Sequence, residues 1–147
     1  MKILWVDDQP KNNEVEIEDI KARLHGIGAE FVQSEQVPDA LERLRSGLYN
    51  VVITNYGDGR CGGKAIAECV LEGVEQLSKK PPVIIYSMNV RPEMAAKMKC
   101  KGAMADTQEP NILFAWIVRG LAADFAFEPS PQVKKFCTEQ KKREARQ

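Results

Sequence analysis

Long hydrophobic runs are missing from this 147-residue chain, and no apolar stretch approaches the roughly 18 residues of a membrane span. A signal peptide is missing as well, because Met1 leads directly into the strand-like KILWV. Neither sign of charge is in excess, since lysine plus arginine equals aspartate plus glutamate at 21 each. These absences argue against a membrane or nucleic-acid partner, and they predict a cytoplasmic protein.

Histidine and cysteine are scarce. His25 is the only histidine, and the four cysteines form no C-x-x-C pair and show no repeated spacing. This composition excludes the standard zinc patterns. In a cytosolic protein such cysteines are expected to be reduced thiols, so the sequence predicts no disulfide bond. The cysteines are Cys61, Cys69, Cys100 and Cys137.

Short apolar segments alternate five times with segments of helical period. Segments that are apolar throughout and separated by helices predict a parallel sheet that is covered on both faces. A G-x-G-x-x-G turn is absent, and five βα units without it favour the flavodoxin-like (βα)5 fold, a doubly wound α/β sheet with strand order 2-1-3-4-5. The predicted strands are residues 3–6, 29–34, 51–54, 82–87 and 103–107.

The last part of the chain differs in composition from the rest. Residues 1–125 hold the five units and form one predicted domain, which ends with a helix over 111–125. From 126 to 147 the chain is polar and basic, with six basic residues against two acidic ones after 128. Pro129 and Pro131 are expected to break the helix, and only Val133 and Phe136 offer apolar anchors. We therefore expect a basic tail that is flexible or forms a short helix.

Polar side chains follow the predicted strands directly. Asp7 and Asp8 follow the first strand, Asn55 the third and Ser87 the fourth, and Glu109 follows the fifth. In this winding the site lies at the carboxyl ends of the strands where their order reverses, which is between the first and third strands. Two adjacent carboxylates repel each other and favour a counter-charge. The oxygen atoms at 7, 8 and 55 are therefore candidate ligands for Mg²⁺.

Four segments of the chain, ILWVDDQP, VVITNYG, PVIIYS and KGAMADTQEP, resemble the signatures of bacterial response-regulator receiver domains of the chemotaxis type. The resemblance covers roughly residues 1–125. It implies that Asp7 and Asp8 correspond to the acidic pair that binds Mg²⁺ in the family. It likewise implies that Ser87 corresponds to the hydroxyl that contacts the phosphoryl group, and Pro110 to the proline that follows a lysine.

Three positions depart from the family pattern. Asn55 stands at the phosphoacceptor aspartate, Glu109 at the lysine and Asp106 at the aromatic switch residue. An amide has no anionic oxygen to attack phosphorus, so Asn55 cannot form an acyl phosphate. Glu109 would repel phosphoryl oxygens that a lysine attracts. The resemblance and its departures together predict a non-enzymatic pseudo-receiver that cannot be phosphorylated at position 55 and acts by binding a protein partner.

Two alternatives use the same strand ends. A pocket of Asp7, Asp8 and Glu109 would hold three negative charges and no lysine, which predicts a bound Mg²⁺ or a protonated carboxyl. Such a pocket could belong to a metal-dependent phosphoryl-group enzyme or sensor. The other alternative is a receiver that is phosphorylated at Asp8 or at Asp58 in the Gly-Asp-Gly turn.

The resemblance also indicates an interaction surface. In the family, the fourth helix, fifth strand and fifth helix carry dimerisation and output. Here these elements correspond to residues 92–101, 103–107 and 111–125. A homodimer through this face, or a protein partner bound there, is therefore expected.

Overall fold

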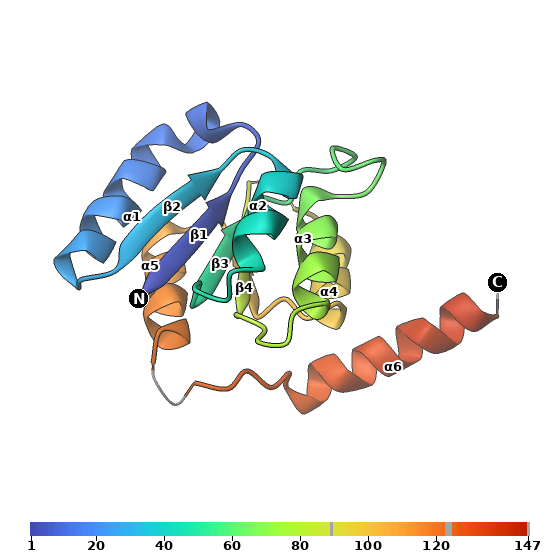
Figure 1. Ribbon diagram of the computed structural model, residues 1–147. Helices are drawn as coiled ribbons and strands as arrows, with labels where there is room; N and C mark the ends of the chain where they lie inside the picture. Colours follow the sequence, from blue (N-terminus) through green and yellow to red (C-terminus); the bar gives the residue numbers. More distant parts are fainter. Residues whose placement is uncertain (89, 123–124, 147) are drawn as a thin grey trace.

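A five-stranded parallel sheet forms the centre of the protein in the computed structural model, which describes residues 1–88, 90–122 and 125–146. The strand order is β2-β1-β3-β4-β5, so the flavodoxin-like fold predicted from the sequence is confirmed. Figure 1 shows the strands with their carboxyl ends at one edge of the sheet. The strands are β1 Lys2–Val6, β2 Glu30–Ser34, β3 Val51–Thr54, β4 Val83–Tyr86 and β5 Ala105–Thr107.

Helices cover both faces of the sheet. The buried side chains of α1 (Glu14–Gly26) and α5 (Pro110–Gly120) pack with one face of the strands. The opposite face is covered by α2 (Val37–Leu44), α3 (Ile66–Glu75) and α4 (Pro92–Cys100). A short 3-10 turn, η1 (Pro10–Asn13), connects β1 to α1. This two-sided cover explains why β1, β3 and β4 are apolar on both faces.

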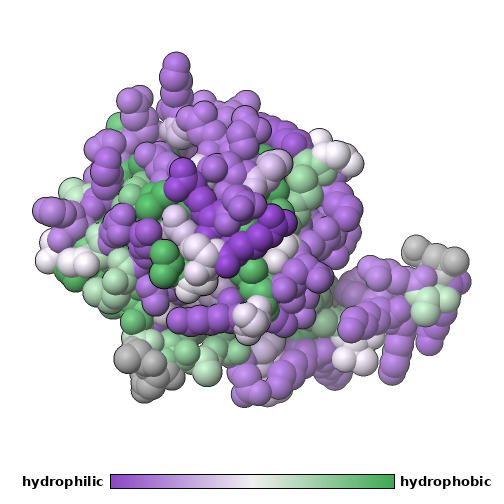
Figure 2. All heavy atoms as spheres, in the orientation of Figure 1, coloured by the Kyte–Doolittle hydropathy of each residue, from purple (hydrophilic) through white to green (hydrophobic). Residues whose placement is uncertain are grey.

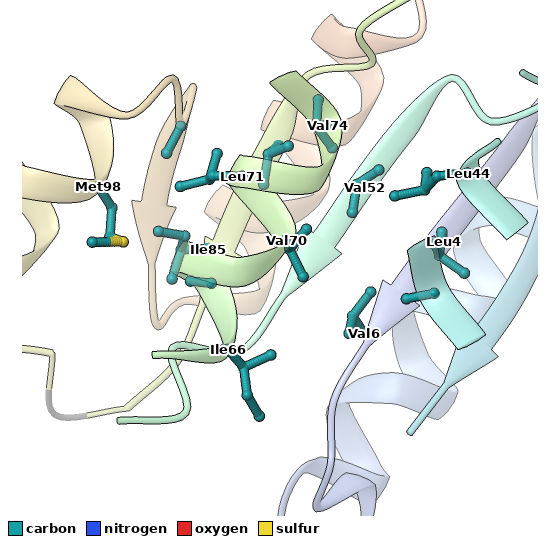
Figure 3. Packing of buried hydrophobic residues seen from close by; sticks show 14 of the residues in the cluster. Leu4, Val6, Leu44, Val52, Ile66, Val70, Leu71, Val74, Ile85 and Met98 are labelled. Atoms are coloured by element: carbon teal, nitrogen blue, oxygen red, sulfur yellow. The ribbon is translucent and has the colours of Figure 1, made fainter. Parts of the chain in front are cut away.

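The alternation of side chains along each strand divides the core into two clusters. In β1, Leu4 and Val6 point towards α2 and α3, whereas Ile3 and Trp5 point towards α1 and α5. Figure 3 shows the first cluster, in which Val70 of α3 and Met98 of α4 lie over the sheet. Met98 is fully buried, so it belongs to the core and not to an outer surface.

Two helices end earlier than their apolar patterns indicate. The apolar spacing of α2 continues to Leu48. The helix itself ends at Leu44, and the Leu48 side chain is exposed. The helix predicted over 111–125 ends at Gly120, because the chain there turns away towards the carboxyl terminus. Residues 123–124 of that prediction lie outside the described residues.

The carboxyl-terminal segment contains a sixth helix, α6 (Pro131–Ala145). Ser130 caps it, because its hydroxyl accepts a hydrogen bond from the backbone amide of Val133 at 3.2 Å. Pro131 was predicted to break a helix and instead occupies the first turn, where its missing N–H costs nothing. Val133 and Phe136, the two predicted anchors, are both half-buried.

All four cysteines are paired, so the prediction of free thiols is wrong for this structure. Cys61 is bonded to Cys69, eight residues further along the chain. Cys100 at the end of α4 is bonded to Cys137 in α6, with their Cα atoms 5.4 Å apart. The spacing of 37 residues carried no signal, because only the packing of α6 on α4 brings these two residues together.

The face of the protein in Figure 2 is mostly hydrophilic, with small hydrophobic areas scattered over it, and α6 projects from the body at the right. Within the described parts of the chain, no helix combines the length and the apolar character needed to cross a membrane.

Candidate functional site

The ends of β1, β3 and β4 bring three of the predicted site residues together. Val6 pairs with Thr54 in the sheet, so the residues that follow them start side by side. The backbone amide of Asn55 donates to the Val6 carbonyl at 3.0 Å. Asp7, Asn55 and Ser87 line one cavity of about 380 Å³ at this edge. The structure thus brings these three residues together at the strand-order reversal, where the sequence placed the candidate site.

Asp7 holds the connection between β1 and α1. Its side chain is only 2% exposed. One carboxylate oxygen accepts a hydrogen bond from the backbone amide of Gln9 at 2.9 Å, and the other accepts from Asn13 Nδ2 at 3.1 Å. A buried carboxylate needs such partners, and both of its oxygens have one.

Asn55 and Arg60 bind the same oxygen of Asp8. Asn55 Nδ2 and Arg60 Nη1 each donate to Asp8 Oδ1 at 3.0 Å. Asn55 is 8% exposed, and its buried Oδ1 atom has no hydrogen-bond partner among the residues that the structure describes. An aspartate at position 55 would bring a second carboxylate against Asp8, whereas the amide provides a donor. The asparagine therefore offers Asp8 a hydrogen-bond donor where an aspartate would add a like charge.

The loop between β3 and α3 is structured so that Arg60 stands over the strand ends. Gly57 has a φ of 60°, and a side chain there would collide with Ile66, whose nearest atom would lie 2.6 Å from its Cβ. The backbones of Cys61 and Lys64 exchange two hydrogen bonds around a tight turn. The Cys61–Cys69 disulfide ties this turn to α3. The glycine-rich loop is thus fastened at both ends around Arg60.

Glu109 and Asp106 lie away from the cavity, so the pocket predicted from the sequence has a different composition. Glu109 is exposed at the start of α5, where a negative charge interacts favourably with the helix dipole, and its backbone amide donates to Thr107 Oγ1 at 3.0 Å. Asp106 pairs with Lys99 Nζ of α4 at 3.1 Å. Asp106 is therefore tied to α4 by an ion pair and does not line the strand-end cavity.

The charges at the site are nearly balanced, contrary to the expectation of three uncompensated carboxylates. Asp7 and Asp58 line the cavity together with Arg60 and Arg91. Asp8 lies beside it and is paired with Arg60. An arginine thus supplies the counter-charge for which the sequence predicted a metal ion.

Mg²⁺ with Asp7, Asp8 and Asn55 as ligands does not fit these side chains as they are arranged. Both oxygens of Asp7 accept hydrogen bonds, and Asn55 turns its nitrogen, not its oxygen, towards Asp8. Among residues 1–88, 90–122 and 125–146, no group of three histidine, cysteine, aspartate or glutamate side chains is arranged to hold a metal ion.

Sequence reasoning missed the role of Arg60 and Arg91. Both side chains come from loops, and nothing in their spacing relates them to Asp8 or to Asn55. Tyr56 also lines the cavity, and its burial, followed by the negative charge of Asp58, raises the pKa of its phenol. The one available signal for Arg60 was its position in a glycine-rich loop that directly follows the third strand.

Known proteins resemble this chain in structure but not in sequence. No family model and no curated protein matches it. A response regulator from Hahella chejuensis superposes with a TM-score of 0.69 at 15% identity, covering 86% of this chain and 100% of the other. One from Desulfuromonas acetoxidans gives 0.66 at 18% identity, covering 84% and 98%. An orphan response regulator of H. pylori gives 0.65 at 18% identity, covering 82% and 96%. At these identities the comparison shows the fold of a response-regulator receiver domain.

Proposed function

We propose that this protein is a cytoplasmic, non-enzymatic pseudo-receiver that signals by binding a protein partner and takes no phosphoryl group at position 55. The observation that carries the proposal is the triad of Asn55, Asp8 and Arg60. In the receiver family that the sequence resembles, an acidic pair, a metal ion and an acceptor aspartate occupy this place. Here an amide replaces the acceptor and a guanidinium replaces the metal charge.

The chemistry of the triad argues against phosphoryl transfer. The amide of Asn55 has no anionic oxygen to attack phosphorus. The lone pairs of Asp8 Oδ1 are engaged by two donors, which lowers its nucleophilicity. Glu109, at the position of the family's lysine, leaves no cation from β5 beside the cavity. The amide of Asn55, the two donors bound to Asp8 and the acid at position 109 each remove a different part of the family reaction.

Acetyl phosphate with Mg²⁺, followed by intact-mass measurement, tests this proposal. The expected result is an unchanged mass for the wild type. Asp58→Asn and Asp8→Asn serve as matched variants for the alternative that a different aspartate accepts the phosphoryl group. A gain of one phosphoryl group in the wild type that is lost in either variant would establish that alternative and overturn the proposal.

The other alternative is a metal-dependent phosphoryl-group enzyme or sensor built on Asp7, Asp8 and Glu109. Its weakness is that Glu109 is exposed at the start of α5 and does not line the cavity with Asp7. Three carboxylates that are not gathered around one point cannot share a cation. We therefore favour the binding module.

The same proposal assigns dimerisation or partner binding to the face of α4, β5 and α5. On α5, the Ile112 side chain is 49% exposed and Trp116, one turn further, is half-buried beside Arg119. In sedimentation at rising concentration we expect the mass to increase from 16.5 kDa towards that of a dimer. Ile112→Lys should keep the chain monomeric. A strictly monomeric wild type at high concentration would exclude the homodimer.

A further inference from the structure

Helix α6 rests on α4 through one narrow face. Val133, Phe136, Cys137 and Gln140 are half-buried and recur three or four residues apart, which places them on one side of the helix. No residue of α6 is fully buried, and residues 141–146 are exposed. Figure 1 shows the far end of α6 extending away from the body.

The non-covalent part of this contact is small. Val133 and Phe136 border a cavity of about 420 Å³ together with Pro92, Ala95 and Ala96 of α4. The alanines are short and leave the apolar contact incomplete. In the part of the chain that the structure describes, no side-chain hydrogen bond or ion pair joins α6 to α4. The covalent link between Cys100 and Cys137 is thus the strongest connection between the two helices.

We propose that Cys100–Cys137 is a thiol–disulfide exchange site and that its oxidation state decides whether α6 covers the α4–β5 surface. This surface is formed by Ala95, Ala96 and Lys99 of α4 and by Asp106 of β5. The oxidised bond holds α6 over it, and reduction releases α6 and uncovers it. We call this bond and the helix that it holds the latch. Its action does not depend on the chemistry at position 55.

The reaction partner is a dithiol reductant. Its thiolate attacks one sulfur of the bond to give a mixed disulfide and releases the other cysteine as a thiolate, which takes up a proton. The second thiol of the reductant then attacks the mixed disulfide and frees the remaining cysteine. Two electrons and two protons pass to the protein, and the reductant leaves as a disulfide.

The site is accessible to such a reductant. Cys100 and Cys137 line a cavity of about 430 Å³ whose rim carries polar side chains. Three lysines and two glutamates border it, and the small excess of positive charge favours the thiolate form of a cysteine that is released. Cytosolic thiols are kept reduced, so a disulfide in a cytoplasmic protein is expected to be transient and regulatory.

Reduction should unfold α6 because the helix has little stability of its own. Isolated helices of about 12–15 residues are marginal in water, and α6 has 15 residues. It carries Lys134, Lys135, Lys141, Lys142 and Arg143 against Glu139 and Glu144, which leaves uncompensated positive charge along it. Once the bond is open, only the weak contact of Val133 and Phe136 favours the docked helix.

The second disulfide provides a matched control. Cys61–Cys69 closes a short loop whose ends are also fixed by backbone hydrogen bonds between Cys61 and Lys64. Helix α3 is independently anchored by Ile66, Val70 and other buried side chains. Opening this bond should leave both α3 and α6 in place.

Hydrogen–deuterium exchange of the full-length oxidised protein, measured by mass spectrometry before and after treatment with dithiothreitol, tests the latch. Exchange of the α6 amides is expected to accelerate by at least about tenfold on reduction, as for a locally unfolded segment. Cys137→Ser should exchange rapidly in α6 without reductant. In the double variant Cys61→Ser/Cys69→Ser, the α6 amides should exchange slowly until reductant is added.

Two outcomes would overturn the proposal. One is that α6 stays protected after intact mass has shown both bonds to be reduced. The other is that β1, β3 and β4 lose protection together with α6, because the bond would then support the whole fold and not the position of one helix. Accelerated exchange that is confined to α6 supports the latch.

Discussion

At position 55 an amide, and not a carboxylate, determines how the neighbouring side chains are bonded. Asn55 donates to Asp8, and Arg60 donates to the same oxygen, so the guanidinium offsets the negative charge of Asp8. The exposed fractions of the Arg60 and Asp8 side chains are 43% and 26%, so their ion pair is worth only about 0–1 kcal/mol. We expect it to affect which ion the site accepts more than it affects stability.

Removing the guanidinium should therefore give the site affinity for a divalent cation. In calorimetry with Mg²⁺ we expect no binding to the wild type and weak binding, on the order of millimolar, to Arg60→Ala. The physical reason is that Asp7 and Asp8 then lie adjacent and Asp8 has lost the guanidinium that was paired with it.

Two variants control this experiment. Arg45→Ala removes an arginine that pairs with Glu42 at 2.7 Å on α2, away from the site, and it should bind no Mg²⁺. Arg60→Ala combined with Asp8→Ala should lose the affinity again. Binding of Mg²⁺ by the wild type as strongly as by Arg60→Ala would show that Arg60 does not occupy the place of the cation.

Among the helices, the close approach of α2 to α3 depends on a residue without a side chain. Gly73 lies in α3, and a Cβ at this position would overlap the side chain of Leu41 in α2. Gly26, at the end of α1, is also helical but has nothing within 4 Å of the equivalent position. A substitution at Gly73 therefore tests the packing of two helices, whereas the same substitution at Gly26 tests helix propensity alone.

Alanine at these two positions should change stability in opposite directions. We expect Gly73→Ala to lower the free energy of unfolding by about 1–3 kcal/mol, because the half-buried Leu41 side chain must move out of its contact with α3. Gly26→Ala should raise it by up to about 1 kcal/mol, because alanine loses less backbone entropy in a helix. Urea denaturation of both variants measures the difference, and an equal effect at the two sites would refute the packing argument.

In the molecule as a whole, the sheet buries an ionisable ring at its centre. Tyr86 packs edge-on against Trp5, with ring centroids 5.6 Å apart, and is 3% exposed. Burial raises the pKa of its phenol, and the negative charges of Glu16 and Glu109 raise it further. Glu109 thus influences the β4–α1 side of the fold, not the cavity for which the sequence predicted it.

This raised pKa makes stability depend on alkaline pH. The folded-state pKa of Tyr86 lies above the unfolded value of about 10, so its contribution is fully present below pH 10. The contribution is lost as the pH rises through the folded-state pKa. The melting temperature of the wild type should therefore fall more between pH 9 and about pH 11 than that of Tyr86→Phe. Parallel curves for the two proteins would contradict the assignment.

The fold could be predicted from the sequence because it follows from local patterns. Runs such as Val51–Thr54 are apolar on both faces, and that property by itself requires a covered parallel sheet. The meeting of Asp7, Asn55 and Ser87 was predictable for the same reason, since they follow strands whose order determines where their carboxyl ends lie. These conclusions need only the chain order and the period of the side chains.

Only the tertiary structure decided how these residues are bonded and what lies beside them. Arg60 and Arg91 reach the cavity from loops, and Glu109 does not line it, because loop paths are determined by turns and contacts that have no period in the sequence. The pairing of Cys100 with Cys137 is likewise a matter of distance in space, since 37 residues separate them along the chain. Hydrophobic periodicity specifies layers, whereas the partners of individual polar and sulfur atoms depend on how those layers are joined.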